Sequence, residues 1–209
     1  FFASLNVTIL EGYGLTETAP VISFNLPNEG FRKDSVGRLF PDIECKTIHP
    51  ETRCDQSLGE SGLLCFRGPN IFKGYLDEIE KTNEVLTDDG WFITGDLGYI
   101  DNEGFLYIEG RLSRFSKIGG EMVPHGTLED EVRKILDPNR DKNFGLVIIG
   151  QPDESKGEQL ILVIDKEINF PELRKSLTLN GIPNLWIPKK IKKIKEIPIL
   201  STGKTDIFK

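Results

Sequence analysis

A glycine-containing segment near the start of the chain carries side chains that could bind a phosphate and a metal ion. It reads Gly12-Tyr13-Gly14-Leu15-Thr16-Glu17. Glycines allow a backbone to approach a ligand closely, and the Thr16 hydroxyl can donate to a phosphate oxygen. Glu17 supplies the hard oxygen ligand that Mg²⁺ takes together with substrate phosphates. The segment therefore predicts a phosphate and Mg²⁺ site, with a plain glycine turn and a surface glutamate as the alternative.

An acidic residue, Asp96, ends the second candidate segment, Trp91-Phe92-Ile93-Thr94-Gly95-Asp96. A carboxylate can accept hydrogen bonds from both hydroxyls of a ribose, and each bond to a charged group contributes roughly 1.5–3 kcal/mol. Arg111 stands near the point where the sequence pattern changes and could complete a ribose clamp. A surface salt bridge is the alternative for Arg111.

A lysine near the end of the chain lies in a glycine turn, Gly203-Lys204-Thr205. The phosphate loop G-x-x-x-x-G-K-[ST] does not fit, because its first glycine would stand where the chain has Pro198. A lysine on such a tip can be brought to a site where charge develops during a reaction, and one such donor is worth about 2.7–4 kcal/mol. The alternative is an ordinary solvated lysine.

The elements that must position these side chains change character near Gly110. Before it, short apolar blocks separated by Gly and Pro indicate antiparallel strands, closer to a barrel or sandwich than to βαβ units. Asp101-Asn102-Glu103-Gly104 predicts a hairpin turn, and residues 77–85 predict a short helix capped by Asp77. The expected strands are 1–10, 44–48, 62–67, 91–94, 99–100 and 105–108.

After Gly110 the pattern predicts a small α+β domain with a boundary at about 111–113. Thr127 is expected to open a helix, with Asp130 in a weak capping box. Pro171 suits the first turn of a second helix that stops at Gly181. The inward positions of the two helices are Leu128, Val132, Ile135 and Leu136, then Leu173 and Leu177. The expected strands are 143–150 and 159–165, and a bulged edge strand at 190–197.

Bulk properties exclude several classes of protein. A net charge of −7 over 209 residues argues against a general nucleic-acid binder. No apolar run approaches the roughly 18 residues of a membrane span. Three cysteines, Cys45, Cys54 and Cys65, form no CxxC pair and suggest reduced thiols in a cytosol. Lysines concentrate at residues 189–209, which is either a solvated strand edge or a dock for an acidic partner.

Four motifs, at residues 12–17, 91–96, 110–121 and 200–206, resemble in this order those of the adenylate-forming enzymes, which include acyl-CoA and acyl-carrier synthetases, luciferases and peptide-synthetase adenylation domains. Four further segments look like the acyl-[acyl-carrier-protein] synthetase part of bacterial 2-acylglycerophosphoethanolamine acyltransferase proteins. They are residues 114–123, 155–158, 181–188 and 197–206.

The resemblance implies an enzyme that uses ATP and Mg²⁺ to activate a fatty acid and passes it to the phosphopantetheine thiol of acyl carrier protein. It implies that residues 1–112 are the β-rich, distorted-barrel end of a large AMP-binding domain and that 113–209 are a small mobile lid. The chain alone, as a C-terminal fragment, is then expected to be inactive. The full-length protein would be cytoplasmic, with peripheral association to the inner membrane left open.

The resemblance also implies roles for individual residues. The catalytic group is Lys204, Thr16 and Glu17, with Glu17 holding the metal. The cofactor-binding residues are Gly12, Tyr13, Gly14, Thr16, Asp96, Arg111, Lys117 and Gly120. The hinge falls at Ser113 or Arg114, where the family usually has Asp or Lys, and Met122 replaces a phosphate-binding Arg of many relatives.

Two other functions remain open from the sequence. A long-chain fatty acyl-CoA ligase would carry the same site residues, because CoA and carrier protein present the same arm. A non-catalytic module could bind a carrier protein through the lysine-rich edge, although such a module needs neither Glu17 nor Asp96 nor Lys204.

Overall fold

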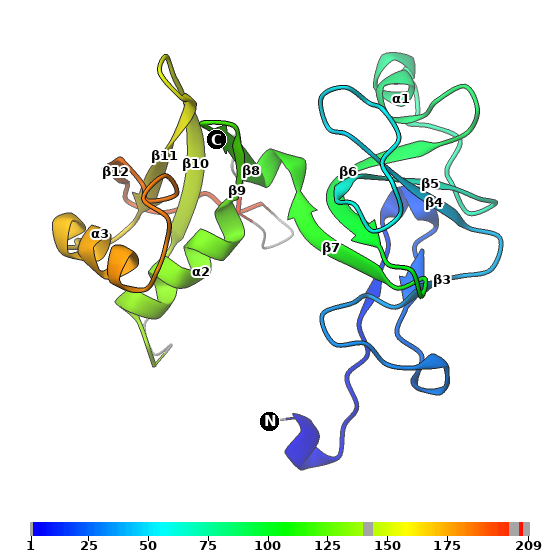
Figure 1. The fold of residues 1–209 in the computed structure, drawn as a ribbon, viewed down its shortest axis with the longest axis horizontal. Helices are drawn as coiled ribbons and strands as arrows, with labels where there is room; N and C mark the ends of the chain where they lie inside the picture. The colour runs from blue at the N-terminus through cyan, green and yellow to red at the C-terminus, as the bar shows by residue number, and fades with distance from the viewer. Residues whose placement is uncertain (1, 140–143, 201–204, 207–209) are drawn as a thin grey trace. The chain divides into compact units, whose positions relative to one another are not determined.

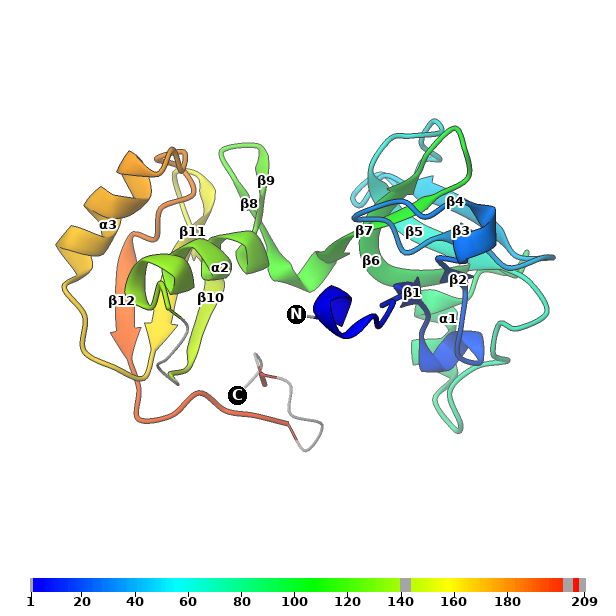
Figure 2. The same cartoon turned by 90° about the horizontal axis from the view of Figure 1, so that it is seen from below.

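The protein, as a computed structural model, is a mixed α+β chain of two compact units, Phe1–Leu112 and Ser113–Lys209 (Figures 1 and 2). The structure describes residues 2–139, 144–200 and 205–206. The predicted catalytic residue Lys204 lies outside the described residues. Each unit is considered by itself below.

The first unit contains two antiparallel sheets, of order β1-β2-β3 and β4-β5-β6-β7. Strand β5 is central in its sheet, and Leu63, Leu64, Cys65 and Phe66 are all buried. The distorted barrel expected from the sequence stays a prediction. The strands are Gly12–Tyr13 (β1), Ser23–Phe24 (β2), Arg38–Leu39 (β3), Glu44–Ile48 (β4), Gly62–Arg67 (β5), Phe92–Ile100 (β6) and Leu106–Arg111 (β7).

Several predicted elements of this unit are confirmed. Strands β4 and β5 have the expected bounds. The predicted blocks at 91–94 and 99–100 fall in the single strand β6, which begins one residue later than expected, at Phe92. The hairpin at 101–104 joins β6 to β7, and Asp101 Oδ1 accepts from the backbone N–H groups of Glu103 and Phe105, both at 2.9 Å. This side-chain acceptor explains why the turn forms at Asp101.

Two expectations in the first unit are wrong. The strand expected at 1–10 is wrong, because Phe2–Leu5 is a 3₁₀ helix (η1) and no described strand pairs with residues 6–10. Asp77 does not cap helix α1, Ile79–Val85. Its φ of +58° turns its backbone away from a cap geometry, and Glu78 takes the N-cap position without a side-chain bond.

The second unit is a five-stranded sheet with two helices packed on one face (Figure 2). Strands β10 and β11 form its long antiparallel pair, β8 and β9 a hairpin, and β12 runs parallel to β11. The opposite face of β10 and β11 carries Val147 and Val163 under Ile197. The elements are Phe115–Ile118 (β8), Glu121–Pro124 (β9), His125–Leu136 (α2), Leu146–Asp153 (β10), Gly157–Ile164 (β11), Phe170–Leu179 (α3) and Lys190–Lys193 (β12).

The helices of this unit bury the expected faces but do not both start where expected. Leu128 and Val132 are fully buried from α2, and Leu173 and Leu177 are buried from α3. Pro171 lies in the first turn of α3, and the Asn169 side chain accepts from Glu172 N as the N-cap. Helix α2 begins at His125 after Pro124, so the capping box expected at Thr127 is wrong.

Two strand expectations need correction as well. Strand β12 spans four residues in unbroken register with β11, so the predicted bulged strand at 190–197 is too long and is not bulged. The β8–β9 hairpin was not expected. Its two-residue turn consists of Gly119 and Gly120, with φ of +59° and +90°, which is the backbone that two-residue hairpin turns require.

Candidate functional site

A buried carboxylate forms the centre of the candidate site in the first unit. Asp96 is 4% exposed, and its Oδ2 accepts a 2.6 Å hydrogen bond from the Tyr13 hydroxyl. Its Oδ1 lies 3.2 Å from Nε of Arg111, the residue that faces it across β6 and β7. Its backbone N–H donates to Thr94 Oγ1. Burial and the neighbouring Asp96 charge raise the pKa of Tyr13, so the phenol keeps its proton and remains a donor.

This arrangement leaves Asp96 with capacity for a ligand. An ionised carboxylate offers about four lone-pair sites, and Tyr13 and Arg111 take two of them. The others suit the two hydroxyls of a ribose. The Arg111 side chain is 60% exposed and can contact a ligand while it holds Asp96.

The second carboxylate, Glu17, lies in a 3₁₀ turn, η2, at Thr16–Thr18. Its Oε1 accepts a 2.8 Å hydrogen bond from the Tyr75 hydroxyl, and its backbone carbonyl accepts from Phe72 N at 2.9 Å. The turn itself is stabilised by Thr18, whose buried hydroxyl bonds the N–H and the carbonyl of Leu15. Thr16 is exposed and can reach a ligand.

Arg111 has a small electrostatic effect on both phenols. The pKa values of Tyr13 and Tyr75 are raised, first by burial and then by Asp96 and Glu17 respectively, and the positive charge of Arg111 offsets a small part of each shift. The Phe72 ring, next to Tyr75, also packs edge-on against Phe92 of β6, with ring centroids 5.4 Å apart. The predicted residues thus form two sets of contacts, Tyr13–Asp96–Arg111 and Glu17–Tyr75.

Packing alone requires glycine at both glycine positions of the first motif, in addition to the predicted approach of a ligand. A Cβ on Gly14 would lie 1.8 Å from the Pro20 carbonyl oxygen, and one on Gly12 would lie 2.4 Å from the Phe24 ring. Both positions therefore need glycine for the packing of this segment, whether or not a ligand approaches it.

The donor set around Glu17 fits a magnesium ion held mainly by a substrate. No group of three or more His, Cys, Asp or Glu side chains that could cage a metal occurs in the described part of the chain. Mg²⁺ usually keeps several waters and takes one or two protein carboxylates together with substrate phosphates. Glu17, with Oε1 held by Tyr75 and a second oxygen beside it, meets that requirement.

The predicted hinge lies between one anchored arginine in each unit. Arg111 pairs with Asp96 in the first unit. Arg114, at the end of the 3₁₀ helix η4 (Leu112–Arg114), donates to Glu129 Oε1 at 2.5 Å and to the Ile148 carbonyl at 3.3 Å in the second. Since Arg114 is fixed to its own unit, Leu112 and Ser113 are left as the residues between the two anchors.

Two further predicted residues of the second unit, Lys117 and Gly120, lie in or next to the β8–β9 turn. Lys117 in β8 donates its backbone N–H to Glu158 Oε2 at 2.6 Å. Gly120 lies in the turn itself, and a Cβ added there would meet no atom within 4 Å, so this side of the turn is open.

The sequence did not single out two titratable residues that the structure places near the predicted ones. Tyr75 holds Glu17, as described above. His125 is 3% exposed, and its Nε2 lies 2.9 Å from Ser116 Oγ. Burial, aided by the charge of Arg114, lowers the pKa of His125 to about 4, so the ring is neutral. Neither residue belongs to a motif with a distinctive spacing, so no sequence signal pointed to them.

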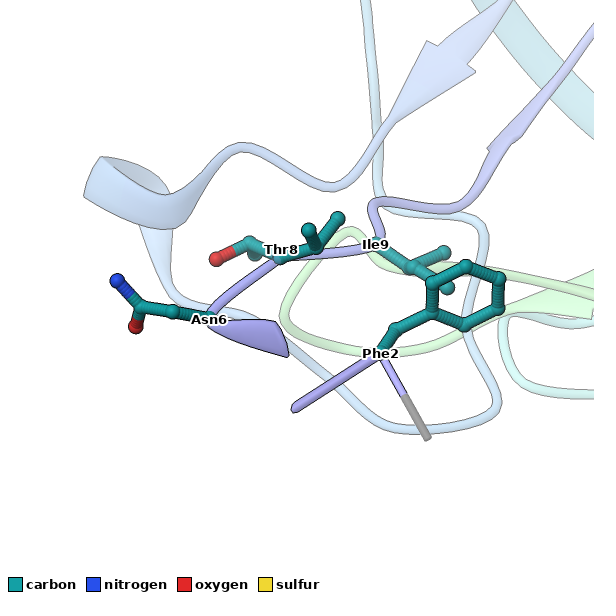
Figure 3. A pocket seen from close by; sticks show the side chains of 5 residues that line it. Phe2, Asn6, Thr8 and Ile9 are labelled. Carbon is teal, nitrogen blue, oxygen red and sulfur yellow. The ribbon is translucent and has the colours of Figure 1, made fainter. Parts of the chain in front are cut away.

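A hollow near the beginning of the chain is separate from these residues. It is lined by Phe2, Asn6, Val7, Thr8 and Ile9, and none of the predicted site residues contributes to it (Figure 3).

In the described ranges no helix has both the length and the apolar character needed to cross a bilayer.

The chain is similar to known proteins. Residues 1–76 match the AMP-binding enzyme family. The chain is 34% identical to 4-coumarate--CoA ligase-like 9 of Arabidopsis thaliana, over 85% of this chain and 34% of that protein. It is 36% identical to 4-coumarate--CoA ligase-like 6 of Oryza sativa subsp. japonica, over 73% of this chain and 25% of that protein.

The chain is also similar to solved structures of enzymes that bind ATP or AMP. ATP-bound MatB from Rhodopseudomonas palustris matches 96% of this chain and 39% of its own, with a TM-score of 0.76 and 29% identity. O-succinylbenzoate coenzyme A synthetase (MenE) from Bacillus subtilis in complex with AMP matches 98% and 41%, with a TM-score of 0.77 and 25% identity. These findings support membership of the adenylate-forming AMP-binding enzyme superfamily, which includes the acyl-CoA ligases. The chain spans 22% to 36% of the length of these and similar curated relatives.

Proposed function

We propose that the full-length protein is an AMP-forming acid–thiol ligase. The observation that supports this proposal is the pair of oriented carboxylates, Asp96 held by Tyr13 and Arg111, and Glu17 held by Tyr75, which would bind the ribose hydroxyls and a metal ion respectively. ATP is the nucleotide that fits the proposal, and the solved relative MatB is described as ATP bound. Residues 1–112 would then be part of the large nucleotide-binding domain, and 113–209 the small domain.

In the first half-reaction an oxygen of the acid attacks the α-phosphorus of ATP, the bond to the β-phosphate breaks, and pyrophosphate leaves. Asp96 and Arg111 would hold the ribose, beside Gly12, Tyr13 and Gly14, and Thr16 would contact a phosphate. Mg²⁺ on Glu17 would neutralise phosphate charge when bound. Lys204, which lies outside the described residues, would place its ammonium between the attacking carboxylate and the phosphate, where charge develops.

In the second half-reaction a thiol sulfur attacks the acyl carbonyl, AMP leaves, and the thiol proton is lost to solvent. The small domain would turn at Leu112–Ser113, between the anchored arginines 111 and 114. Gly120, on the open side of its turn, and Lys117 beside it would then line the path of the thiol-bearing arm. Using domain rotation to serve two half-reactions is a recognised form of catalytic gating.

The test is exchange between ATP and labelled pyrophosphate in the full-length protein, with a panel of carboxylic acids. Exchange that depends on an acid is expected. Lys204→Ala should abolish exchange yet spare transfer to a thiol from supplied acyl-adenylate. An absence of exchange with every acid, or full exchange in the Lys204→Ala protein, would contradict the proposal.

The proposal extends to the identity of the carboxylic acid substrate and of the thiol that accepts the acyl group. We infer a fatty acid, and a phosphopantetheine thiol of either CoA or acyl carrier protein. The relatives are named as CoA ligases, which favours CoA. The exposed lysines at 190, 192 and 193 on β12 favour an acidic carrier protein. Mass analysis of products formed with both acceptors present separates the two.

A further inference from the structure

Tyr75 belongs to the segment 70–75, which donates three hydrogen bonds to the turn that carries Glu17. Asn70 Nδ2 donates to the Thr18 carbonyl at 2.8 Å, Phe72 N donates to the Glu17 carbonyl at 2.9 Å, and the Tyr75 hydroxyl donates to Glu17 Oε1 at 2.8 Å. The first two contacts fix the backbone of the turn. Only the third acts on the carboxylate itself.

The Tyr75 side chain is held in place before any ligand arrives. Its backbone N–H donates to Thr82 Oγ1 at 2.9 Å, and its carbonyl accepts from Glu78 N at 3.2 Å. Its ring packs edge-on against Phe72, with centroids 4.9 Å apart. Gly74, where a Cβ would lie 2.7 Å from the Thr82 side chain, allows Thr82 to come this close. The phenol therefore has a fixed position from which to orient a flexible glutamate.

The Tyr75 phenol acts as the donor in this contact. Its O–H donates to Glu17 Oε1 at 2.8 Å, and an ionised carboxylate can only accept hydrogen bonds. The contact therefore occupies one oxygen of Glu17 and leaves the other for a ligand.

We propose that Tyr75 is a positioning residue for the metal: its hydroxyl holds Glu17 Oε1 and thereby directs Oε2 to the cation. This inference rests on the proposed function, in which Glu17 binds Mg²⁺. Groups that orient a metal ligand by hydrogen bonding commonly contribute 10–100-fold to metal affinity or activity.

The experiment measures how much a divalent cation strengthens nucleotide binding, without turnover. Calorimetry on the full-length protein gives the affinity for α,β-methylene-ATP with and without Mn²⁺. Three variants are compared with the parent: Tyr75→Phe, Glu17→Gln and the control Tyr107→Phe. Tyr107 also donates to a carboxylate, Asp101 Oδ2 at 3.4 Å, and its ring stacks on Tyr99, so neither contact involves Glu17.

Tyr75→Phe is expected to reduce the Mn²⁺-dependent gain in affinity about 10-fold while nucleotide binding without metal stays unchanged. Tyr107→Phe should keep the full gain. If Glu17→Gln loses the gain but Tyr75→Phe retains it, the inference on Tyr75 is wrong and the proposed role of Glu17 stands. If Glu17→Gln retains the gain, the proposed metal role itself fails. Weaker nucleotide binding in Tyr75→Phe without metal would show a purely structural role and overturn the inference.

Discussion

Asp96 and Arg111 face each other across β6 and β7, with Arg111 Nε 3.2 Å from Asp96 Oδ1. The acid is 4% exposed, whereas the arginine side chain is 60% exposed. A buried carboxylate is costly unless it is paired and hydrogen-bonded, and the Tyr13 hydroxyl completes the set on Oδ2. The carboxylate is therefore fixed in one orientation by the fold, and a ligand hydroxyl need not order it.

Asp96→Asn tests this carboxylate as a nucleotide ligand. The amide keeps the shape but loses the charge, and a hydrogen bond to a charged group contributes roughly 1.5–3 kcal/mol. ATP affinity in the full-length protein is expected to fall at least about 10-fold, since 1.4 kcal/mol is a factor of ten. Calorimetry measures it. Glu103→Gln, which removes a charge from the exposed pair with Arg32, is the control and should leave ATP affinity unchanged. Equal ATP affinity in the parent and Asp96→Asn proteins would refute the ribose role.

Gly14→Ala tests the close backbone contact in the first motif. A Cβ there would lie 1.8 Å from the Pro20 carbonyl oxygen, a fixed backbone atom. Such overpacking typically costs about 1–3 kcal/mol of unfolding free energy. Gly126 in α2 is the matched control, because a Cβ there meets nothing within 4 Å, and Gly126→Ala should stabilise by about 0.4–1 kcal/mol. Chemical denaturation of the chain measures both. A Gly14→Ala protein as stable as the parent would contradict the contact.

The elements predicted correctly from the sequence are those specified by local chemistry. Asp101 accepts from two turn N–H groups, and Pro171 and Asn169 start α3 through residues within one turn. Errors arose where structure depends on distant partners. The apolar run at 7–10 looks like a strand but finds no strand partner in the described ranges, and a strand is defined by such pairing. The β8–β9 hairpin was predictable from Gly119-Gly120 between two short runs.

The residues of the candidate site also fall into those that local sequence motifs identify and those that only distant contacts reveal. Tyr13, Glu17, Asp96 and Arg111 belong to recognisable motifs, so the sequence could name them. Tyr75 could not be named, because its importance comes from a hydrogen bond to a residue 58 positions away. His125 was missed since its neutral state results from burial against Ser116, which no spacing reveals.

His125 predicts how stability depends on pH. Burial lowers its pKa from 6.5 to about 4, so between these values the unfolded chain binds more protons than the folded chain. Stability must then fall as pH is lowered from about 6.5 toward 4, by up to about 3 kcal/mol. Urea denaturation at several pH values measures the loss. His125→Gln should flatten this part of the curve, while His49→Gln, which replaces the chain's other histidine, should not. An unchanged slope in His125→Gln would mean that other groups cause the loss.

Glu129→Ala tests the anchor that fixes Arg114 to the second unit. Glu129 Oε1 accepts from Arg114 Nη2 at 2.5 Å and from Ile148 N at 2.6 Å, so its removal leaves two donors unpaired. Unsatisfied buried groups cost about 1–3 kcal/mol each, and a loss of about 2 kcal/mol in unfolding free energy is expected. Glu131→Ala is the control on the same helix, because it breaks only the surface pair with Lys134, worth less than about 0.5 kcal/mol.

The same Glu129→Ala substitution tests the hinge in the full-length protein. Freeing Arg114 should alter thiol transfer more than pyrophosphate exchange, because the hinge is needed for the second half-reaction. Equal losses in both half-reactions would place the pivot elsewhere than Leu112–Ser113.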